Sequence, residues 1–71
     1  MTLGALESLY INTSSDDLLV ILHVALDDGD NMAPEVFTAI NELVERSHLG
    51  LLSPSQIESL GFYRRVAAGG F

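Results

Sequence analysis

Three carboxylates close together are the most distinctive polar feature of the chain. Asp27, Asp28 and Asp30 surround Gly29 in a stretch whose composition is typical of a turn. An EF-hand calcium loop needs oxygen ligands at alternate positions and glycine at the sixth. Counted from Asp28, the third-ligand and glycine positions hold Met32 and Ala33, which argues against calcium. The aspartates are therefore interpreted either as a solvated turn or as a contact for a basic partner.

The two histidines are the next candidates, because imidazole titrates near neutral pH. His48 is expected in the last turn of a helix, where the dipole alone explains a cationic side chain. We expect His23 to pack at the edge of an interface rather than to bind a metal or catalyse. The serines lie mostly at expected helix caps, and no nucleophile, base and orienting acid can be assembled. The sequence therefore predicts a protein that is not an enzyme.

Basic and aromatic residues occur together only in Phe62-Tyr63-Arg64-Arg65. The region from residue 31 to this segment resembles the first part of a helix-turn-helix: an amphipathic helix, a Leu-Ser-Pro turn and a capped helix. That resemblance implies a DNA-associated regulator. It fails in the segment after Gly61, which is short and has two arginines where binding in a DNA groove needs a basic face.

Gly69-Gly70 resembles the Gly-Gly terminus of ubiquitin-like sulfur carriers. Here Phe71 follows, and the pattern upstream predicts helices rather than a sheet wrapped on one helix. This alternative is weaker than the helix-turn-helix.

Composition limits the function further. The 71 residues include ten Asp and Glu against three Arg and no Lys, for a net charge of -7. Such a charge opposes binding to nucleic acid and anionic membranes and favours basic partners. No cysteine is present, which removes disulfides, thiolate zinc sites and a cysteine nucleophile. We expect no metal or cofactor, and the lack of a signal-peptide pattern predicts a cytoplasmic protein.

A helix in the middle of the chain must organise these groups. Residues 18–26 are apolar except for His23, Ser15 is the expected N-cap, and Gly29 suits the left-handed residue after a C-terminus. Because Val20, Ile21 and Val24 also favour sheets, a buried strand is the alternative. The caps and the length of about three turns favour the helix.

This helix is expected to be apolar on two opposite sides. Leu18, Leu22, Ala25 and Leu26 share one face, whereas Val20 and Val24 point almost the opposite way, with His23 beside them. A helix that is apolar all round is normally buried all round. Since a chain this small buries only about 60% of its unfolded surface, we predict a homodimer through Val20, His23 and Val24. If the chain is instead a stable monomer, the face belongs to a different protein.

Three further helices complete the expected fold. A first helix runs from Thr2 to about Tyr10, with Leu3, Leu6, Leu9 and Tyr10 forming its apolar stripe. A third runs from residues 31–33 to about His48 and stops at Gly50. A short fourth has a capping box at Ser53-Pro54-Ser55-Gln56 and ends at Gly61 in a Schellman motif. Residues 63–66 either extend from this helix or pack back on the bundle.

Burial in these helices follows from their periodicity. In the third helix Val36, Phe37, Ile40, Leu43, Val44 and Ser47 are expected inside, and Thr38, Glu42, Glu45 and Arg46 outside. We expect Leu6, Ile57 and Phe62 to close the ends of the core. The fold class is therefore all-α, a bundle of three to four helices forming one domain over residues 1–66, with 67–71 as a flexible tail.

The sequence thus favours a small acidic module that binds and modulates another protein, as an inhibitor or adaptor of the kind phages encode. An apolar helix face rimmed by carboxylates would contact a basic or apolar surface, with Asp27, Asp28, Asp30, Tyr63, Arg64 and Arg65 as partner-binding residues. A narrower hypothesis is nucleic-acid mimicry, in which the carboxylates occupy a basic DNA-binding cleft.

Overall fold

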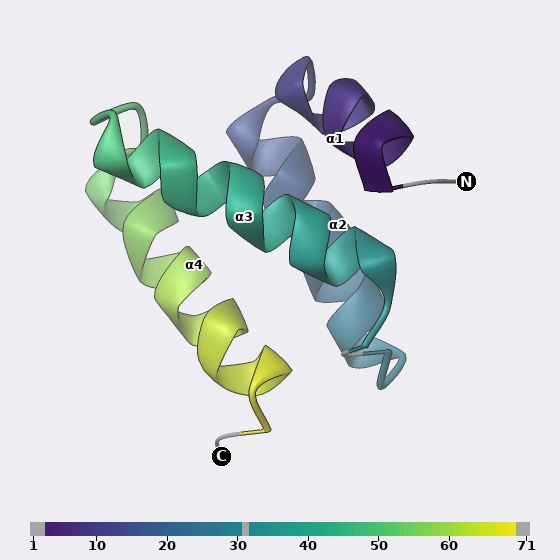
Figure 1. Ribbon diagram of the computed structural model, residues 1–71. Coiled ribbons are helices and arrows are strands. Elements are labelled where there is room, and N and C mark those ends of the chain that lie inside the picture. Colours follow the sequence, from purple (N-terminus) through teal and green to yellow (C-terminus); the bar gives the residue numbers. More distant parts are fainter. Residues whose placement is uncertain (1–2, 31, 70–71) are drawn as a thin grey trace.

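The computed structural model describes residues 3–30 and 32–69, and all the regular structure in these ranges is helical (Figure 1). The helices are α1 (Leu3–Ile11), α2 (Ser15–Asp27), α3 (Pro34–His48) and α4 (Pro54–Ala67). The all-α prediction is confirmed. The strand alternative for residues 18–26 is wrong, because this segment lies within α2.

The helices form a thin two-layer arrangement. α3 crosses α2 and contacts all three other helices, while α2 and α4 also pack directly on each other (Figure 1). Hydrogen bonds join Asp16 to Gln56 and His23 to Tyr63, both with an offset of 40 residues, so α2 and α4 run side by side in the same direction. The Cα extents are 29 × 29 × 16 Å. Because packed helices lie about 8–10 Å apart, so thin a molecule leaves one side of α2 uncovered.

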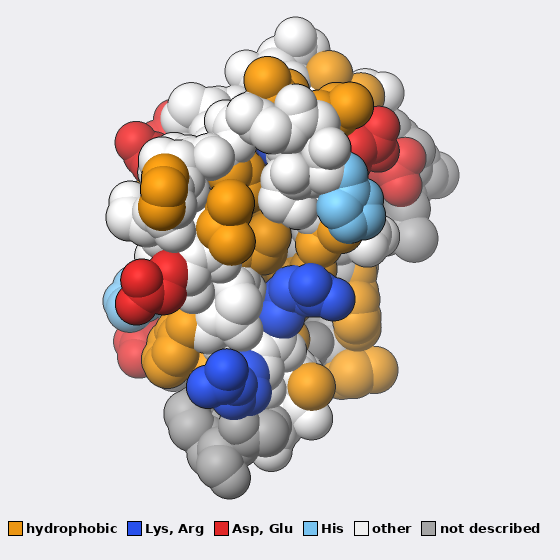
Figure 2. Space-filling model, turned by 90° about the vertical axis from the view of Figure 1, so that its left-hand side faces the viewer, with side chains coloured by type: hydrophobic (Ala, Val, Ile, Leu, Met, Phe, Trp, Pro, Cys, Tyr) orange, Lys and Arg blue, Asp and Glu red, His pale blue; other side chains and the backbone are white. Residues whose placement is uncertain are grey.

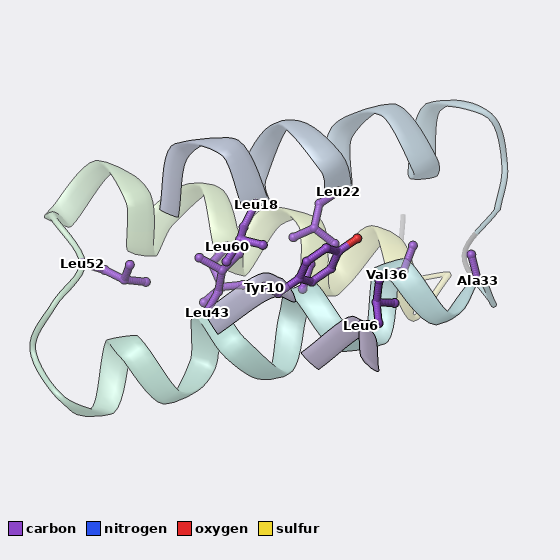
Figure 3. Packing of buried hydrophobic residues seen from close by; sticks show 10 residues of the cluster. Leu6, Tyr10, Leu18, Leu22, Ala33, Val36, Leu43, Leu52 and Leu60 are labelled. Carbon is purple, nitrogen blue, oxygen red and sulfur yellow. The ribbon is translucent and has the colours of Figure 1, made fainter. Parts of the chain in front are cut away.

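The core lies where α2, α3 and α4 meet. Leu18, Leu22, Val36 and Leu43 are completely buried, and Leu60 enters the same cluster from α4 (Figure 3). The predicted inner face of α2 is therefore confirmed, with Ala25 and Leu26 half-buried at its end. The remaining buried apolar residues of the cluster are Leu6, Tyr10, Ala33, Ala39 and Leu52.

Tyr10 brings a polar group into this apolar cluster. Its side chain is only 4% exposed. Burial, and secondarily the negative charge of Glu35, raises the pKa of the Tyr10 phenol above its usual value of 10.0. The phenol therefore stays neutral to higher pH in the folded protein than in the unfolded chain.

Some of the expected burial in α1 and α3 is wrong. Leu9 is 59% exposed and Phe37 is 45% exposed, although both were expected inside. Thr38, expected outside, is 3% exposed. The reason is the position of α1, which packs on the side of α3 that bears Thr38. The sequence pattern of α3 does not reveal which of its flanks a second helix covers.

The ends of α2 and α3 largely follow the predicted signals. The N-cap of α2 is Ser14 rather than Ser15: the Ser14 hydroxyl accepts a hydrogen bond from the Asp17 amide at 3.2 Å. Gly29 and Gly50 have positive φ angles of 78° and 73°, as expected of residues that follow a helix. The predicted cap of α1, Thr2, lies outside the described residues.

The fourth helix differs most from its prediction. Its capping box is confirmed, because the Ser53 hydroxyl accepts from the Gln56 amide and the Gln56 side chain accepts from the Ser53 amide. The predicted stop at Gly61 is wrong, since α4 continues to Ala67 and the positive φ occurs at Gly69.

Packing after Gly61 explains why the helix continues. Leu60, Tyr63 and Ala67 recur at helical spacing and pack against the core. Their burial outweighs the cost of about 1 kcal/mol for a glycine inside a helix. Ile57 and Phe62 do not close the core as expected, because they are 49% and 53% exposed.

Arg46 connects α3 by hydrogen bonds to the junction between α1 and α2. Its guanidinium donates to the Glu42 carboxylate at 2.9 Å, to the Ser15 hydroxyl at 3.0 Å, and to the carbonyls of Tyr10 and Ile11 at 3.0 and 3.2 Å. The i,i+4 pair with Glu42 was expected, but the placement of Arg46 on the solvent side is wrong, because only 12% of its side chain is exposed. A cation at the carbonyl end of α1 also complements the helix dipole.

Candidate protein-interaction surface

The outer side of α2 is apolar and uncovered. Val20 and Val24 lie one turn apart and are 59% and 55% exposed, whereas Leu18 and Leu22 on the opposite side are completely buried. His23 is exposed beside them. The two apolar faces of this helix are thus confirmed, and only one of them is used by the core. We call Val20 and Val24 the valine ridge.

A shallow groove of about 210 Å³ lies between the C-terminal halves of α2 and α4. We call it the α2/α4 groove, and it is lined by His23, Leu26, Asp27, Phe62, Tyr63 and Val66. Because α2 and α4 run in the same direction, residues near 23–27 are held opposite residues near 62–66. The groove combines apolar and aromatic walls with one carboxylate at its rim.

Contacts among the rings of His23, Tyr63 and Phe62 hold the wall of this groove in place. The Tyr63 hydroxyl and His23 Nδ1 are hydrogen-bonded at 3.2 Å, and their rings meet edge to face with centroids 6.1 Å apart. Phe62 packs edge to face on Tyr63 at 5.5 Å. Tyr63 is half-buried, while Phe62 remains largely exposed. Aromatic side chains that are already held in place lose little conformational entropy on binding, which suits them as anchors in interfaces.

The charged residues predicted to bind a partner are all exposed but do not form one group. Asp27 lines the α2/α4 groove, whereas Asp28 and Asp30 lie in the turn after α2. Arg64 and Arg65 are in the last turn of α4. Within the described part of the chain, Arg46–Glu42 is the only ion pair, so neither arginine of α4 neutralises an aspartate there.

Viewed from the side on which α4 lies, hydrophobic side chains are interspersed with polar atoms (Figure 2). Acidic side chains lie toward both margins, and basic side chains lie mainly in the lower half. This face offers no continuous basic strip of the kind that follows a nucleic-acid backbone.

The structure therefore brings together only part of the predicted site. His23, Tyr63 and Asp27 meet in the groove, next to the valine ridge. Sequence reasoning missed the contribution of Leu26, Phe62 and Val66, because it assigned the first two to the core and left open whether the fourth helix reaches the third. The spacing of Phe62 and Val66 could have indicated that they share one face, because they are i,i+4 neighbours on a continuous helix.

A second depression of about 190 Å³ lies between α1 and α3. It is acidic, with Glu7, Glu42 and Glu45 in its wall, but Glu42 is already paired with Arg46. Over residues 3–30 and 32–69, no group of three His, Asp or Glu side chains is arranged to hold a metal ion.

The chain matches no protein-family model, and no curated protein or solved structure is significantly similar to it. In the described ranges no helix has both the length and the apolar character that crossing a bilayer requires. The valine ridge and the α2/α4 groove are therefore the features from which a function can be inferred.

Proposed function

We propose that this chain is a non-enzymatic protein-interaction module that binds and modulates another protein through the valine ridge and the α2/α4 groove. One observation carries the proposal: α2 exposes Val20 and Val24 on the side away from a complete core. In a small, acidic chain, exposed apolar residues on the same helix as a groove with an exposed aromatic residue are typical of an interaction site.

The chemistry of the groove also supports binding over catalysis. His23 is hydrogen-bonded to Tyr63, whereas the Ser14 and Ser53 hydroxyls cap helices. The Ser47 hydroxyl donates to the Val44 carbonyl within α3. Among these described hydrogen bonds, none joins a serine hydroxyl to a histidine. A histidine held by a phenol suits a rigid contact surface.

Self-association is the second candidate use of this face. A homodimer through Val20, His23 and Val24 would bury the valine ridge of each copy, which is the observation that favours it. Sedimentation velocity over a range of micromolar concentrations tests this version: a dimer that Val24→Asp converts to a monomer supports it, and a monomer at all concentrations contradicts it.

Affinity capture from the lysate of the native host, followed by mass spectrometry, tests the general proposal. The wild-type chain should retain a specific protein that is lost with Val24→Asp and with Phe62→Ser. The matched control is Phe37→Ser, which changes a comparably exposed aromatic residue on α3. If wild type and both surface variants retain the same proteins in equal amounts, the proposal is wrong.

The salt dependence of the captured complex distinguishes binding through the carboxylates from binding through the apolar face. Binding that collapses between low and moderate salt supports charge mimicry of a nucleic acid, whereas binding insensitive to salt supports the apolar face.

A further inference from the structure

We infer that the outer side of α2 binds a basic amphipathic helix of a partner protein, an inference that rests on the proposed interaction function. The partner's apolar residues cover the valine ridge and the α2/α4 groove, and its cations meet the acids at both ends of α2.

Acids and valines follow a defined order along the exposed side of α2. Asp16, Val20 and Val24 follow one another at intervals of four, and Asp27 and Asp28 complete the row. In a helix these positions lie on one side, one turn apart. The eleven residue steps from Asp16 to Asp27 correspond to about 16 Å of helix. The surface is therefore acid, valine, valine, acid over about three turns.

The described part of the chain does not neutralise these acids itself. Asp16 accepts a hydrogen bond from the neutral Gln56 side chain at 2.8 Å. Asp17, Asp27 and Asp28 are exposed, and the one ion pair of the described residues lies elsewhere. α2 contains no Lys or Arg, and its last turn has no basic residue to complement the dipole. Cations brought by a partner would satisfy both the carboxylates and the C-terminal end of the helix.

A second copy of this chain is a less favourable occupant of this surface. Two copies of α2 packed antiparallel place Asp16 and Asp17 of one against Asp27 and Asp28 of the other. Packed in parallel, they place each pair against itself. Both arrangements bring acids together between molecules that each carry a charge of -7, and like charges across an interface are costly. A basic helix of a different protein meets no such repulsion.

The shape of the surface is suited to binding a helix. A valine ridge flanked by a groove presents one convex and one concave strip along parallel helices, and an amphipathic helix places residues at i, i+4 and i+7 into such a surface. Phe62 is the exposed aromatic anchor at the wall of the groove. Apolar contact supplies the affinity, while the acidic ends orient the partner and speed its association.

The probe that tests this inference is a synthetic, fluorescently labelled peptide of about 16 residues, apolar at i, i+4, i+7 and i+11 and with arginines at both ends. Two control peptides have the same length: one has a scrambled order, and the other has glutamates in place of the arginines. Fluorescence anisotropy with the full chain at low salt should show binding of the basic helix alone. Equal binding of the scrambled peptide would overturn the inference, because charge without an apolar stripe would then suffice.

Variants locate the binding. Val20→Ser with Val24→Ser should weaken it by at least about tenfold, as expected when two valine contacts are lost. Asp27→Asn with Asp28→Asn should weaken it by about three- to tenfold at low salt and less at high salt. The matched control is Glu7→Gln with Glu45→Gln, which changes the charge equally on exposed positions of α1 and α3. Equal losses from the aspartate and control pairs would overturn the inference, since only net charge would matter.

Sedimentation of the chain alone tests whether a second copy occupies this face, and capture from the host lysate separates the helix inference from the general proposal. A dimer that excludes the peptide, and that Val24→Ser dissociates, would show that a second copy occupies the face. If the basic peptide fails to bind while capture of a host protein still depends on Val24 and Phe62, the helix inference is wrong and the interaction function stands. If capture does not depend on them either, both are wrong.

Discussion

Arg46 offers the sharpest test of how the helices are held together. Replacing it with alanine removes four hydrogen bonds, of which three reach α1 or the first residue of α2. A net value of about 1 kcal/mol for each bond between helices gives a loss of about 3 kcal/mol. A 71-residue domain has a total stability of about 4–10 kcal/mol. We therefore expect Arg46→Ala to lower the free energy of unfolding by a large fraction of the total.

Graded variants separate geometry from charge. Arg46→Lys keeps the charge but cannot reach Glu42, Ser15 and two carbonyls at once, so it should lose about half as much. Glu42→Gln leaves the bonds to α1 and α2 in place and should cost about 0.5–1 kcal/mol. Arg65→Ala, the matched change on an exposed part of α4, should stay within about 0.5 kcal/mol.

Urea denaturation followed by far-ultraviolet circular dichroism measures these free energies of unfolding. Equal stability of Arg46→Ala and Arg65→Ala would contradict the role of Arg46 in joining the helices. Arg46 would then be a solvent-exposed residue, as the sequence pattern of α3 alone predicts.

Three further predictions concern other parts of the fold. Gly61→Ala should stabilise the protein by about 0.5–1 kcal/mol, because Gly61 lies inside α4 without a positive φ and with open space around it; a destabilised variant in urea denaturation would indicate a helix stop there instead. Leu22→Ala should cost about 2–4 kcal/mol, whereas Val24→Ala should change the unfolding free energy by no more than about 0.5 kcal/mol; equal losses would place Val24 in a buried environment. Because the Tyr10 pKa is raised in the folded state, the unfolded chain loses that proton first, so its contribution to stability is present below pH 10.0 and is lost as pH rises through the folded pKa. Tyr10→Phe should show a smaller alkaline loss in denaturation curves measured below and above pH 10, and an unchanged loss would contradict the assignment.

The parts of the fold that follow local rules could be predicted from the sequence. The inner face of α2, the Ser53 capping box and the glycine stops at 29 and 50 depend on residues within one or two turns of each other. The two-sided character of α2 was also visible, because it needs only the period of the helix.

Features that depend on distant segments could not be predicted. Thr38 is buried because α1 lies on it, and Arg46 is half-buried because the end of α1 supplies its acceptors. The continuation of α4 past Gly61 depends on the core that receives Tyr63 and Ala67. The groove was missed for the same reason, since it exists only where Val66 comes to lie beside α2.

Amide NMR spectroscopy of the isotope-labelled full chain, titrated with the basic amphipathic peptide, locates the bound peptide on the surface. We expect chemical-shift changes concentrated at residues 20–27 and 62–66, with the amides of α1 and the middle of α3 unchanged. Shifts centred on α1 and α3, or an unchanged spectrum at saturating peptide, would contradict it.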